Sequence, residues 1–494
     1  MLAEELIDLV HLIQTQRCEA QTVEVKAAQD GCPTRLYDTL SSFSNQDDGG
    51  VIVFGVDERQ EFAVVGVYDA HDLQKHLVEQ CNQMHPPVRA MFTSASIDGK
   101  IVVSAEIPGI DISDRPCYYQ GKGRLKGSYV RVGDADEPIT EYEVYSYEAF
   151  RKRYRDEIEP VSRATRSTLD EQRLGRYLTS ISSSKPNLAQ LDTNTILELM
   201  SITRDGVPTL AGVMLFSLYP QAYVPQLCIV ATVVPGTEPG AVDEAGNRFL
   251  DNKRIEGTLS EQLTGAIAFV RSNMKVATHI DRETGKRHDR EEYPIEAVRE
   301  LVLNALIHRD YSIHTQGMPI QLLLYRDRLE IANPGGLYGR LTVNELGKVQ
   351  PDTRNPVIAT AMEALGETEN RYSGIPTVRR LLSEADMPAP LFESSRGQFR
   401  VTLYGKHGRP EERIVLNDAA GLSDVQRTIA LYCADKPRSR SELAGLLGVQ
   451  APYAMRRYVK PMVDAGQLVL TMPGTPQSSH QRYVTSDALI TRRS

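Results

Sequence analysis

The stretch YPIEAVRELVLNALIHRDY, residues 293–311, decides how the central part of this chain is interpreted. Its apolar residues recur every three or four positions between residues 298 and 306, which predicts an α-helix with one buried face. Glu300 and Asn304 lie four residues apart, so they project from one side of that helix. A carboxylate can polarise an attacking water, and an amide oxygen can help to hold a magnesium ion that bridges phosphates. A surface glutamate and a capping asparagine would share this spacing, so the pair alone is a weak signal.

Two glycine-containing segments farther along the chain favour phosphate binding. QLLLYRDRLEIANPGG, residues 321–336, is typical of two strands joined by a turn, and it ends in Gly335 and Gly336. Glycines permit a backbone to approach a ligand closely. In YSGIPTVRRLL, Gly374 begins a helix, whose free N–H groups and positive dipole end suit a phosphate.

Residues 291–406 resemble the divergent GHKL-type ATPase domain, which is related to the ATP sites of gyrase, MutL and histidine kinases. They are more similar still to the branch often labelled RecG-like or divergent AAA, because HRDY, TRNP and SGI match that branch. The resemblance implies an α/β sandwich that binds ATP and Mg²⁺. It assigns the hydrolytic base to Glu300, the magnesium ligand to Asn304, the adenine-reading position to Asn333, and the glycine loops to Gly335, Gly336 and Gly374.

The chain departs from the GHKL pattern at two positions. Asn333 stands where typical members carry Asp, and Tyr372 stands where a glycine is usual. We therefore expect ATP binding, with slow hydrolysis as the possible enzymatic activity. HRD at 308–310 is similar to a protein-kinase catalytic loop, but Thr315 stands where that loop has Asn. The sequence contains no G-x-x-x-x-G-K-[ST], which excludes a P-loop motor.

The first 157 residues predict an α/β or α+β domain, with strands at 22–27 and 50–57. EAQTVEVKAAQ, SSFSN followed by GG, the GVD strand end and PCYYQGKGRLKGSYVRVG resemble the Schlafen AlbA-type domain. In that family the domain binds nucleic acid, and some members cut RNA with clustered carboxylates. The positions that match those carboxylates are Glu19, Glu24, Asp57 and Glu58, of which Glu24 and Asp57 are the expected ligands of a divalent metal.

A second interpretation of these carboxylates needs no metal. Glu24 would pair with Lys26 on the same face of a strand, and Asp57 would cap a turn; the domain would then bind without cutting, which we favour. Basic residues alternate with tyrosines at 118–131, a pattern that suits backbone contact and base stacking. An exposed hairpin with solubilising charge would look similar. The basic residues expected to contact nucleic acid here are Lys122, Arg124, Lys126 and Arg131.

The rest of the chain divides into a middle region at 158–290, the ATPase-like domain at 291–406, a polar linker at 407–420 and a basic domain at 421–494. In the middle region we expect helices at 186–201 and 254–275 and apolar strands at 209–217 and 227–234.

The last domain carries ten Lys and Arg against five Asp and Glu, although the whole chain has a net charge of −9. Its pattern predicts three helices followed by a two-stranded hairpin, the order of a winged helix-turn-helix. Its recognition helix would present Tyr453, Arg456, Arg457 and Lys460 to DNA. Such modules also serve as protein–protein adaptors.

Bulk composition limits the remaining classes. Hydrophobic residues make up 41% and charged residues 24% of 494 residues, so we expect several globular domains. No apolar run approaches the length of a membrane span. Six scattered cysteines without a C-x-x-C pair suit a reducing, cytoplasmic environment.

We therefore expect an ATP-regulated protein that binds nucleic acid, with DNA favoured over RNA. It would act as a transcription regulator or in defence against foreign DNA, and it would self-associate, with a dimer favoured. The alternative is a metal-dependent nuclease gated by ATP. A third possibility is a scaffold whose winged helix contacts protein.

Overall fold

The computed structural model describes residues 1–280, 287–368, 374–395, 397–406, 413–416, 424–435, 438–447, 449–471, 481–486 and 490–493. The chain forms two compact units. The first comprises Met1–Ile110, Cys117–Pro138 and Arg409–Ser494, and the second comprises Asp111–Pro116 and Ile139–Gly408. Within the described ranges, no helix is long and apolar enough to cross a membrane.

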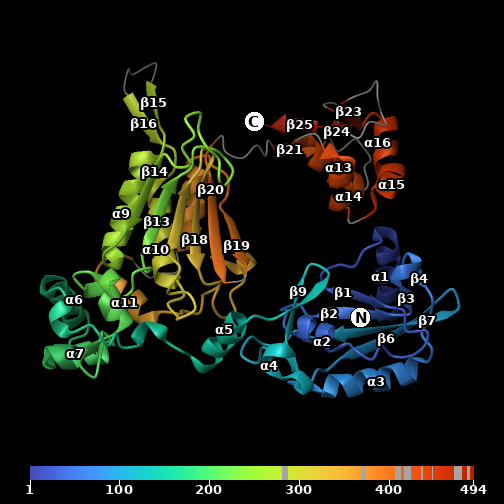
Figure 1. Cartoon of the computed structure of the whole chain (residues 1–494), viewed down its shortest axis with the longest axis horizontal. Helices are drawn as coiled ribbons and strands as arrows, with labels where there is room; N and C mark the ends of the chain where they lie inside the picture. The colour runs from blue at the N-terminus through green and yellow to red at the C-terminus, as the bar shows by residue number, and fades with distance from the viewer. Residues whose placement is uncertain are drawn as a thin grey trace. The chain divides into compact units, whose positions relative to one another are not determined.

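The N-terminal part of the first unit is built on a four-stranded sheet with the order β1-β2-β7-β6 (Figure 1). β1 and β2 are parallel and the other pairs are antiparallel. Ile52 and Val53 are adjacent in β2 and fully buried in two different apolar clusters, so both faces of the sheet are covered. The sheet and its three long helices are β1 (Val23–Lys26), β2 (Gly50–Phe54), β6 (Met91–Ile97), β7 (Lys100–Ile107), α1 (Ala3–Gln16), α2 (Tyr37–Ser44) and α3 (Ala70–Asn82).

Shorter elements complete this part. They are β3 (Val56–Asp57), β4 (Ala63–Val64), β5 (Met84–His85), β8 (Tyr118–Tyr119), α4 (Gly123–Lys126), β9 (Tyr129–Val132) and β10 (Ala135–Pro138). β9 and β10 form an antiparallel hairpin that includes Arg131, one of the basic residues expected to contact nucleic acid.

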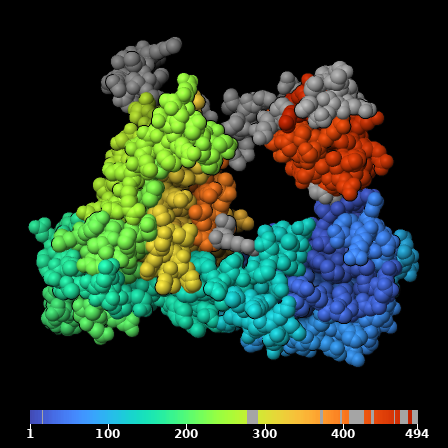
Figure 2. All heavy atoms as spheres, viewed as in Figure 1, coloured from blue at the N-terminus to red at the C-terminus, as the bar shows by residue number. Residues whose placement is uncertain are grey.

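The second unit is built on a six-stranded sheet with the order β14-β13-β17-β18-β20-β19. Only β13 and β17 pair in parallel among these strands. Helices α9 and α10 pack on the sheet, and α12 packs on α10. The yellow and orange atoms in Figure 2, which include strands β17 to β20, reach the surface of this unit. The elements are β13 (Ile229–Val233), β14 (Asp251–Ile255), α9 (Leu259–Asn273), α10 (Ile295–His308), β17 (Ile320–Leu324), β18 (Arg328–Pro334), α12 (Gly374–Glu384), β19 (Leu391–Ser395) and β20 (Gln398–Tyr404).

The expected division between 158–290 and 291–406 crosses this sheet. Ile229 of β13 is opposite Ile320 of β17, and one apolar cluster runs from Leu169 to Leu403. The middle region therefore supplies two strands and a covering helix to the ATPase-like part, because neither part buries its apolar face without the other.

One predicted strand of the middle region is a helix. LAGVMLF at 210–216 forms α8 (Leu210–Phe216), and all seven of its residues are buried. Thr209 caps this helix, accepting a hydrogen bond from Gly212 N at 3.1 Å. A short, wholly apolar run has no periodicity to separate a buried strand from a buried helix, which explains the error.

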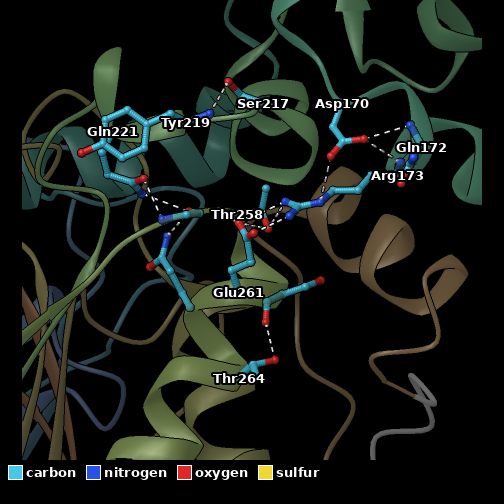
Figure 3. Close-up of polar contacts among 12 residues, drawn as sticks. Asp170, Gln172, Arg173, Ser217, Tyr219, Gln221, Thr258, Glu261 and Thr264 are labelled. Atoms are coloured by element: carbon cyan, nitrogen blue, oxygen red, sulfur yellow. Dashed lines mark hydrogen bonds and ion pairs between the residues drawn. The ribbon is translucent and has the colours of Figure 1, made fainter.

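Several other elements complete this unit. They are α5 (Glu141–Lys152), α6 (Glu171–Ser184), α7 (Thr193–Leu199), β11 (Thr203–Arg204), β12 (Val207–Pro208), β15 (Val276–Ile280), β16 (Arg287–Glu291) and α11 (Pro356–Ala364). Figure 3 shows how α6 is attached to α9: Arg173 pairs with Glu261 and donates to Thr258 Oγ1 at 2.8 Å. Glu261 also caps α9 through Thr258, so one carboxylate serves both contacts.

The C-terminal part of the first unit has its own apolar core, around Ile429, Leu443 and Val459. Its elements are α13 (Asp424–Asp435), β22 (Arg438–Ser439), α14 (Arg440–Leu446), α15 (Ala451–Ala454), a continuing helical turn at Met455–Val459, α16 (Lys460–Asp464), β23 (Leu468–Leu470) and β24 (Arg482–Thr485), with β21 (Arg413–Leu416) paired to β25 (Ile490–Arg493). β22, β24 and β23 form a small sheet. The winged-helix assignment stays a prediction, and part of the expected hairpin lies outside the described residues.

Candidate functional site

Helix α10 places Glu300 and Asn304 at the surface of a cavity. It begins after Pro294, and the apolar residues of its other face are buried against the sheet. Asn304 Nδ2 donates a hydrogen bond of 3.0 Å to Glu300 Oε1. This bond leaves the amide oxygen of Asn304 available to another group.

The cavity has a volume of about 630 Å³, within the range of small-molecule sites. It is bounded by α10, β18, the segment after β18, the segment before α11, and the start of α12. All six residues selected from the sequence for the nucleotide line it: Glu300, Asn304, Asn333, Gly335, Gly336 and Gly374. The polar and aromatic lining residues to which the sequence assigned no role in the nucleotide site include Arg299, His308, Tyr338, Asp352, Thr353, Arg354, Thr368 and Thr377. The sequence signal for three of them was a motif match, since His308 belongs to HRDY and Thr353 and Arg354 belong to TRNP.

Burial raises the pKa of the Glu300 carboxyl above its ordinary value, while the hydrogen bond from Asn304 and the nearby Arg299 act in the opposite direction. A carboxylate with a raised pKa accepts a proton more readily near neutral pH. The environment of Glu300 is therefore compatible with a general base.

Neighbouring atoms approach the backbone closely at two glycines of the cavity wall, where an added Cβ would clash with them. A Cβ on Gly374 would lie 2.2 Å from Glu300 Oε1 and 3.2 Å from Asn304 Nδ2. Gly335 has φ +98°, and a Cβ there would lie 2.5 Å from both Arg354 Nη1 and Asp310 Cβ. Larger residues at these positions would push the cavity walls apart.

Asn333 is the clearest sign that the cavity holds a polar ligand. It lies near the end of β18 opposite Phe399 and is only 5% exposed. Its Oδ1 has no hydrogen-bond partner among the residues that the structure describes. An unsatisfied buried acceptor costs stability, and a ligand with an N–H or O–H group would remove that cost.

Arg309 and Asp310 of the HRD segment are engaged by other groups of the protein. Arg309 is buried and donates to the carbonyl oxygens of Thr315 at 2.7 Å and Met318 at 2.5 Å. Asp310 accepts from Tyr142 Oη at 2.7 Å. Burial alone would raise the pKa of Asp310, but Arg354 and Tyr142 hold it below its ordinary value. Tyr372, the second departure from the GHKL pattern, lies outside the described residues.

In the N-terminal part, the two carboxylates expected to bind metal form ion pairs or hydrogen bonds with other groups of the protein. Glu24 pairs with Lys26 and, at 2.8 Å, with Arg131 Nη2. Asp57 accepts from Arg59 N at 3.0 Å and from Gln60 Nε2 at 2.8 Å. These are the pairing and the cap of the second interpretation. In the described part of the chain, no three His, Cys, Asp or Glu side chains form a group that could hold a metal ion.

Glu19 and Glu58 are electrostatically linked to this arrangement. Glu19 Oε1 accepts from Val25 N at 2.8 Å. Burial and the neighbouring charge of Glu24 raise the pKa of Glu19 to about 7, and Glu58 adds to that effect. Glu19, Glu24 and Glu58 therefore lie close enough to interact electrostatically, but Arg131 and Lys26 neutralise part of their charge.

The prediction that Arg131 contacts nucleic acid is wrong. Its side chain is 1% exposed and pairs with Glu24 and, at 3.0 Å, with Asp136. The alternation of basic and aromatic residues did not reveal that β9 turns this arginine inward. Lys122 and Lys126 are exposed, and Arg124 is half-buried.

Lys122 and Arg124 lie beside aromatic rings. The Lys122 ammonium lies 4.7 Å from the Tyr37 ring centre and Arg124 lies 6.0 Å from that of Tyr118. Tyr37 and Tyr119 are stacked with their ring centres 4.7 Å apart. This part of the surface combines cations with aromatic groups.

In the C-terminal part, the expected recognition residues lie on one helical stretch. Arg456, Arg457 and Lys460 are exposed, and Tyr453 is half-buried. Arg456 and Arg457 lie on the helical turn between α15 and α16.

Comparisons with known proteins identify two regions. Residues 317–403 match the family model HATPase_c_4, described as "Putative ATP-dependent DNA helicase recG C-terminal". Residues 19–140 match the model SLFN_AlbA_2, described as "Schlafen, AlbA_2". No curated protein matches the chain.

Two solved structures are similar to the chain. The DIP2311 protein from Corynebacterium diphtheriae is 18% identical with a TM-score of 0.39, and the match covers 98% of each chain. The N-terminal domain of a RecG-related protein from Nitrosomonas europaea is 26% identical with a TM-score of 0.22, and the match covers 28% of this chain and 94% of that one. The chain thus contains a Schlafen AlbA_2 domain and a RecG-like ATPase-type domain, a combination that indicates ATP binding and a nucleic-acid-related function.

Proposed function

We propose that this protein binds ATP with Mg²⁺ in the cavity beside α10 and uses nucleotide binding to regulate its hold on nucleic acid. One observation carries the proposal: six residues chosen from the sequence, on three separate segments, line a single cavity. The unpartnered Oδ1 of Asn333 in the same wall supports it.

Each of these residues has a proposed role. Asn333 hydrogen-bonds the adenine ring of the nucleotide. The backbone at Gly335, Gly336 and Gly374 approaches its phosphates. Asn304 presents its amide oxygen to the metal, because its Nδ2 is engaged by Glu300. A bound Mg²⁺ would neutralise phosphate charge.

Glu300 is the proposed base for slow hydrolysis. Its raised pKa and its place in the cavity wall suit proton abstraction from a water. The departures from the usual GHKL residues favour binding over rapid turnover.

Nucleic-acid contacts are proposed at two places. Exposed Arg456, Arg457 and Lys460 suit a DNA backbone, and Lys122 and Arg124 beside tyrosines, with exposed Lys126 nearby in the chain, suit a phosphate chain with stacked bases. We propose a DNA-binding regulator of transcription or of defence against foreign DNA, acting as a twofold dimer. The ion pairs of Glu24 and the cap at Asp57 favour binding without cleavage.

Calorimetry tests the nucleotide site directly. The whole protein is titrated with a non-hydrolysable ATP analogue, with and without Mg²⁺, and compared with Asn304→Ala. We expect wild type to bind and to lose affinity without the metal, and Asn304→Ala to bind weakly in both conditions. A wild-type protein that binds no nucleotide would refute the proposal.

A further inference from the structure

Arg354 lies in the cavity wall with an incomplete set of partners. It is 8% exposed, and its Nη1 has no hydrogen-bond partner among the described residues. That atom lies 3.6 Å from Asp310 Oδ2. Among the residues that the structure describes, Nη2 makes one hydrogen bond, a long one of 3.3 Å to the Gly336 carbonyl oxygen. Burying a guanidinium is costly unless it is well paired, so an anionic ligand in the cavity would complete its interactions.

Asp310 connects Arg354 to a helix outside the cavity. Its carboxylate accepts a hydrogen bond of 2.7 Å from Tyr142 Oη and one of 2.8 Å from Ser312 N. Tyr142 lies in the first turn of α5 and does not line the cavity. In sequence, α5 directly follows the residues that match the Schlafen AlbA_2 model.

The other end of α5 contacts the same wall. The rings of Phe150 and Tyr338 meet edge to face with their centres 5.5 Å apart. Tyr338 lines the cavity, and the Arg354 guanidinium lies 5.0 Å from its ring centre. Both ends of α5 therefore contact groups that touch Arg354.

We propose that Arg354 binds the phosphates of the nucleotide and that Asp310 and Tyr142 transmit this event to α5. The inference rests on the proposed function, since it names a further residue that binds the nucleotide in the same cavity. Guanidinium offers a planar fork of N–H donors that matches phosphate oxygens. When Arg354 turns to a phosphate, Asp310 loses part of its neutralising charge and depends more on the hydroxyl of Tyr142.

Thermodynamic linkage gives this relay a measurable consequence. If nucleotide binding strengthens the hydrogen bond between Tyr142 and Asp310, then removing that bond must weaken nucleotide binding. We expect Tyr142→Phe to lower affinity for the ATP analogue roughly fivefold, which is less than the full worth of a hydrogen bond to a charged group, because the bond is already present before the nucleotide binds.

The experiment measures the affinities of the full chain for adenosine and for a non-hydrolysable ATP analogue with Mg²⁺. Arg354→Lys and Arg354→Gln should lose roughly tenfold or more for the analogue but keep their affinity for adenosine, which has no phosphate. Tyr145→Phe is the matched control for Tyr142→Phe. It removes a hydroxyl from the same helix that bonds Asp156 at 2.8 Å instead of Asp310, and its affinities should equal those of wild type.

Three results would overturn the inference. The Arg354 variants could bind the analogue as wild type does, or they could lose adenosine and analogue equally, as a merely structural residue would. Tyr142→Phe could match Tyr145→Phe, which would disprove the relay even if the Arg354 variants fail to fold. Failure of wild type to bind any nucleotide would instead refute the proposed function itself, so the two failures are distinguishable.

Discussion

Gly374 begins α12 directly against Glu300, so closely that a Cβ on Gly374 would lie 2.2 Å from the Glu300 carboxylate oxygen. The two residues are 74 positions apart in the chain. The contact brings the N-terminus of α12 to the same carboxylate that α10 supplies. A larger residue at this position would require the Glu300 side chain or α12 to move.

Gly374→Ala should therefore weaken binding of the ATP analogue by roughly tenfold, because α12 or Glu300 must move to accommodate the methyl group. Calorimetry measures this. Gly175→Ala is the matched control, since Gly175 also lies in a helix but an added Cβ there would meet nothing within 4 Å. The control should bind as wild type does and gain about 0.5–1 kcal/mol of stability. Equal binding by both variants would contradict the proposed cavity.

Glu300→Gln should retain nucleotide binding and lose any ATP hydrolysis, because glutamine keeps the acceptor for Asn304 but cannot take a proton. Phosphate release measures hydrolysis, and calorimetry measures binding. In wild type, hydrolysis should fall as pH decreases through the raised pKa of Glu300, since only the carboxylate form is a base. Hydrolysis that persists in Glu300→Gln would remove Glu300 from this role.

Changing Arg456 and Arg457 to Ala should weaken duplex DNA binding and flatten its dependence on salt, because fewer counterions are released. Binding is measured by fluorescence anisotropy at several ionic strengths. Arg176→Ala with Lys253→Ala removes the same charge from exposed positions of the second unit. If both double variants lose affinity equally, net charge and not the C-terminal domain determines binding.

Glu24→Gln should destabilise the protein by about 1–3 kcal/mol, because buried Arg131 loses a charged partner. It should have little direct effect on nucleic-acid binding. Denaturant unfolding and an RNA and DNA cleavage assay with Mn²⁺ or Mg²⁺ test this together. Metal-dependent cleavage by wild type that disappears in a fully stable Glu24→Gln protein would restore the nuclease hypothesis.

Glu157→Gln should make stability less dependent on pH. Burial raises the pKa of Glu157 to about 7, although Ile358 N and Val357 N donate to it. Between pH 4.5 and 7 the folded state then holds a proton that the unfolded state releases, so stability falls as pH rises. Denaturant unfolding at pH 5 and pH 8 should show a smaller difference for Glu157→Gln than for wild type. Glu159→Gln, at an exposed neighbouring position, should behave as wild type.

The sequence predicted elements best where local pattern was strong. The repeat of apolar residues in ELVLNALI located α10, and the segment 321–336, interpreted as two strands joined by a turn, located β17 and β18. The same pattern failed at LAGVMLF, because a run buried on every side has no polar face to reveal its period. The boundary expected at residue 291 falls between β13 and β17, which pair in one sheet although they are far apart in the chain.

The family resemblance carried by the sequence motifs was enough to select six of the residues that line the cavity and to indicate an ATPase-type domain and a Schlafen AlbA_2 domain. The sequence motifs were not enough to show which charged side chains face solvent and which are buried in ion pairs within the protein. Arg131 was expected outside and is buried among carboxylates, and Tyr142 meets Asp310 across 168 positions of sequence. Such pairings depend on how distant segments pack, because the free energy of a charge is decided by its neighbours in space and not by its neighbours in the chain.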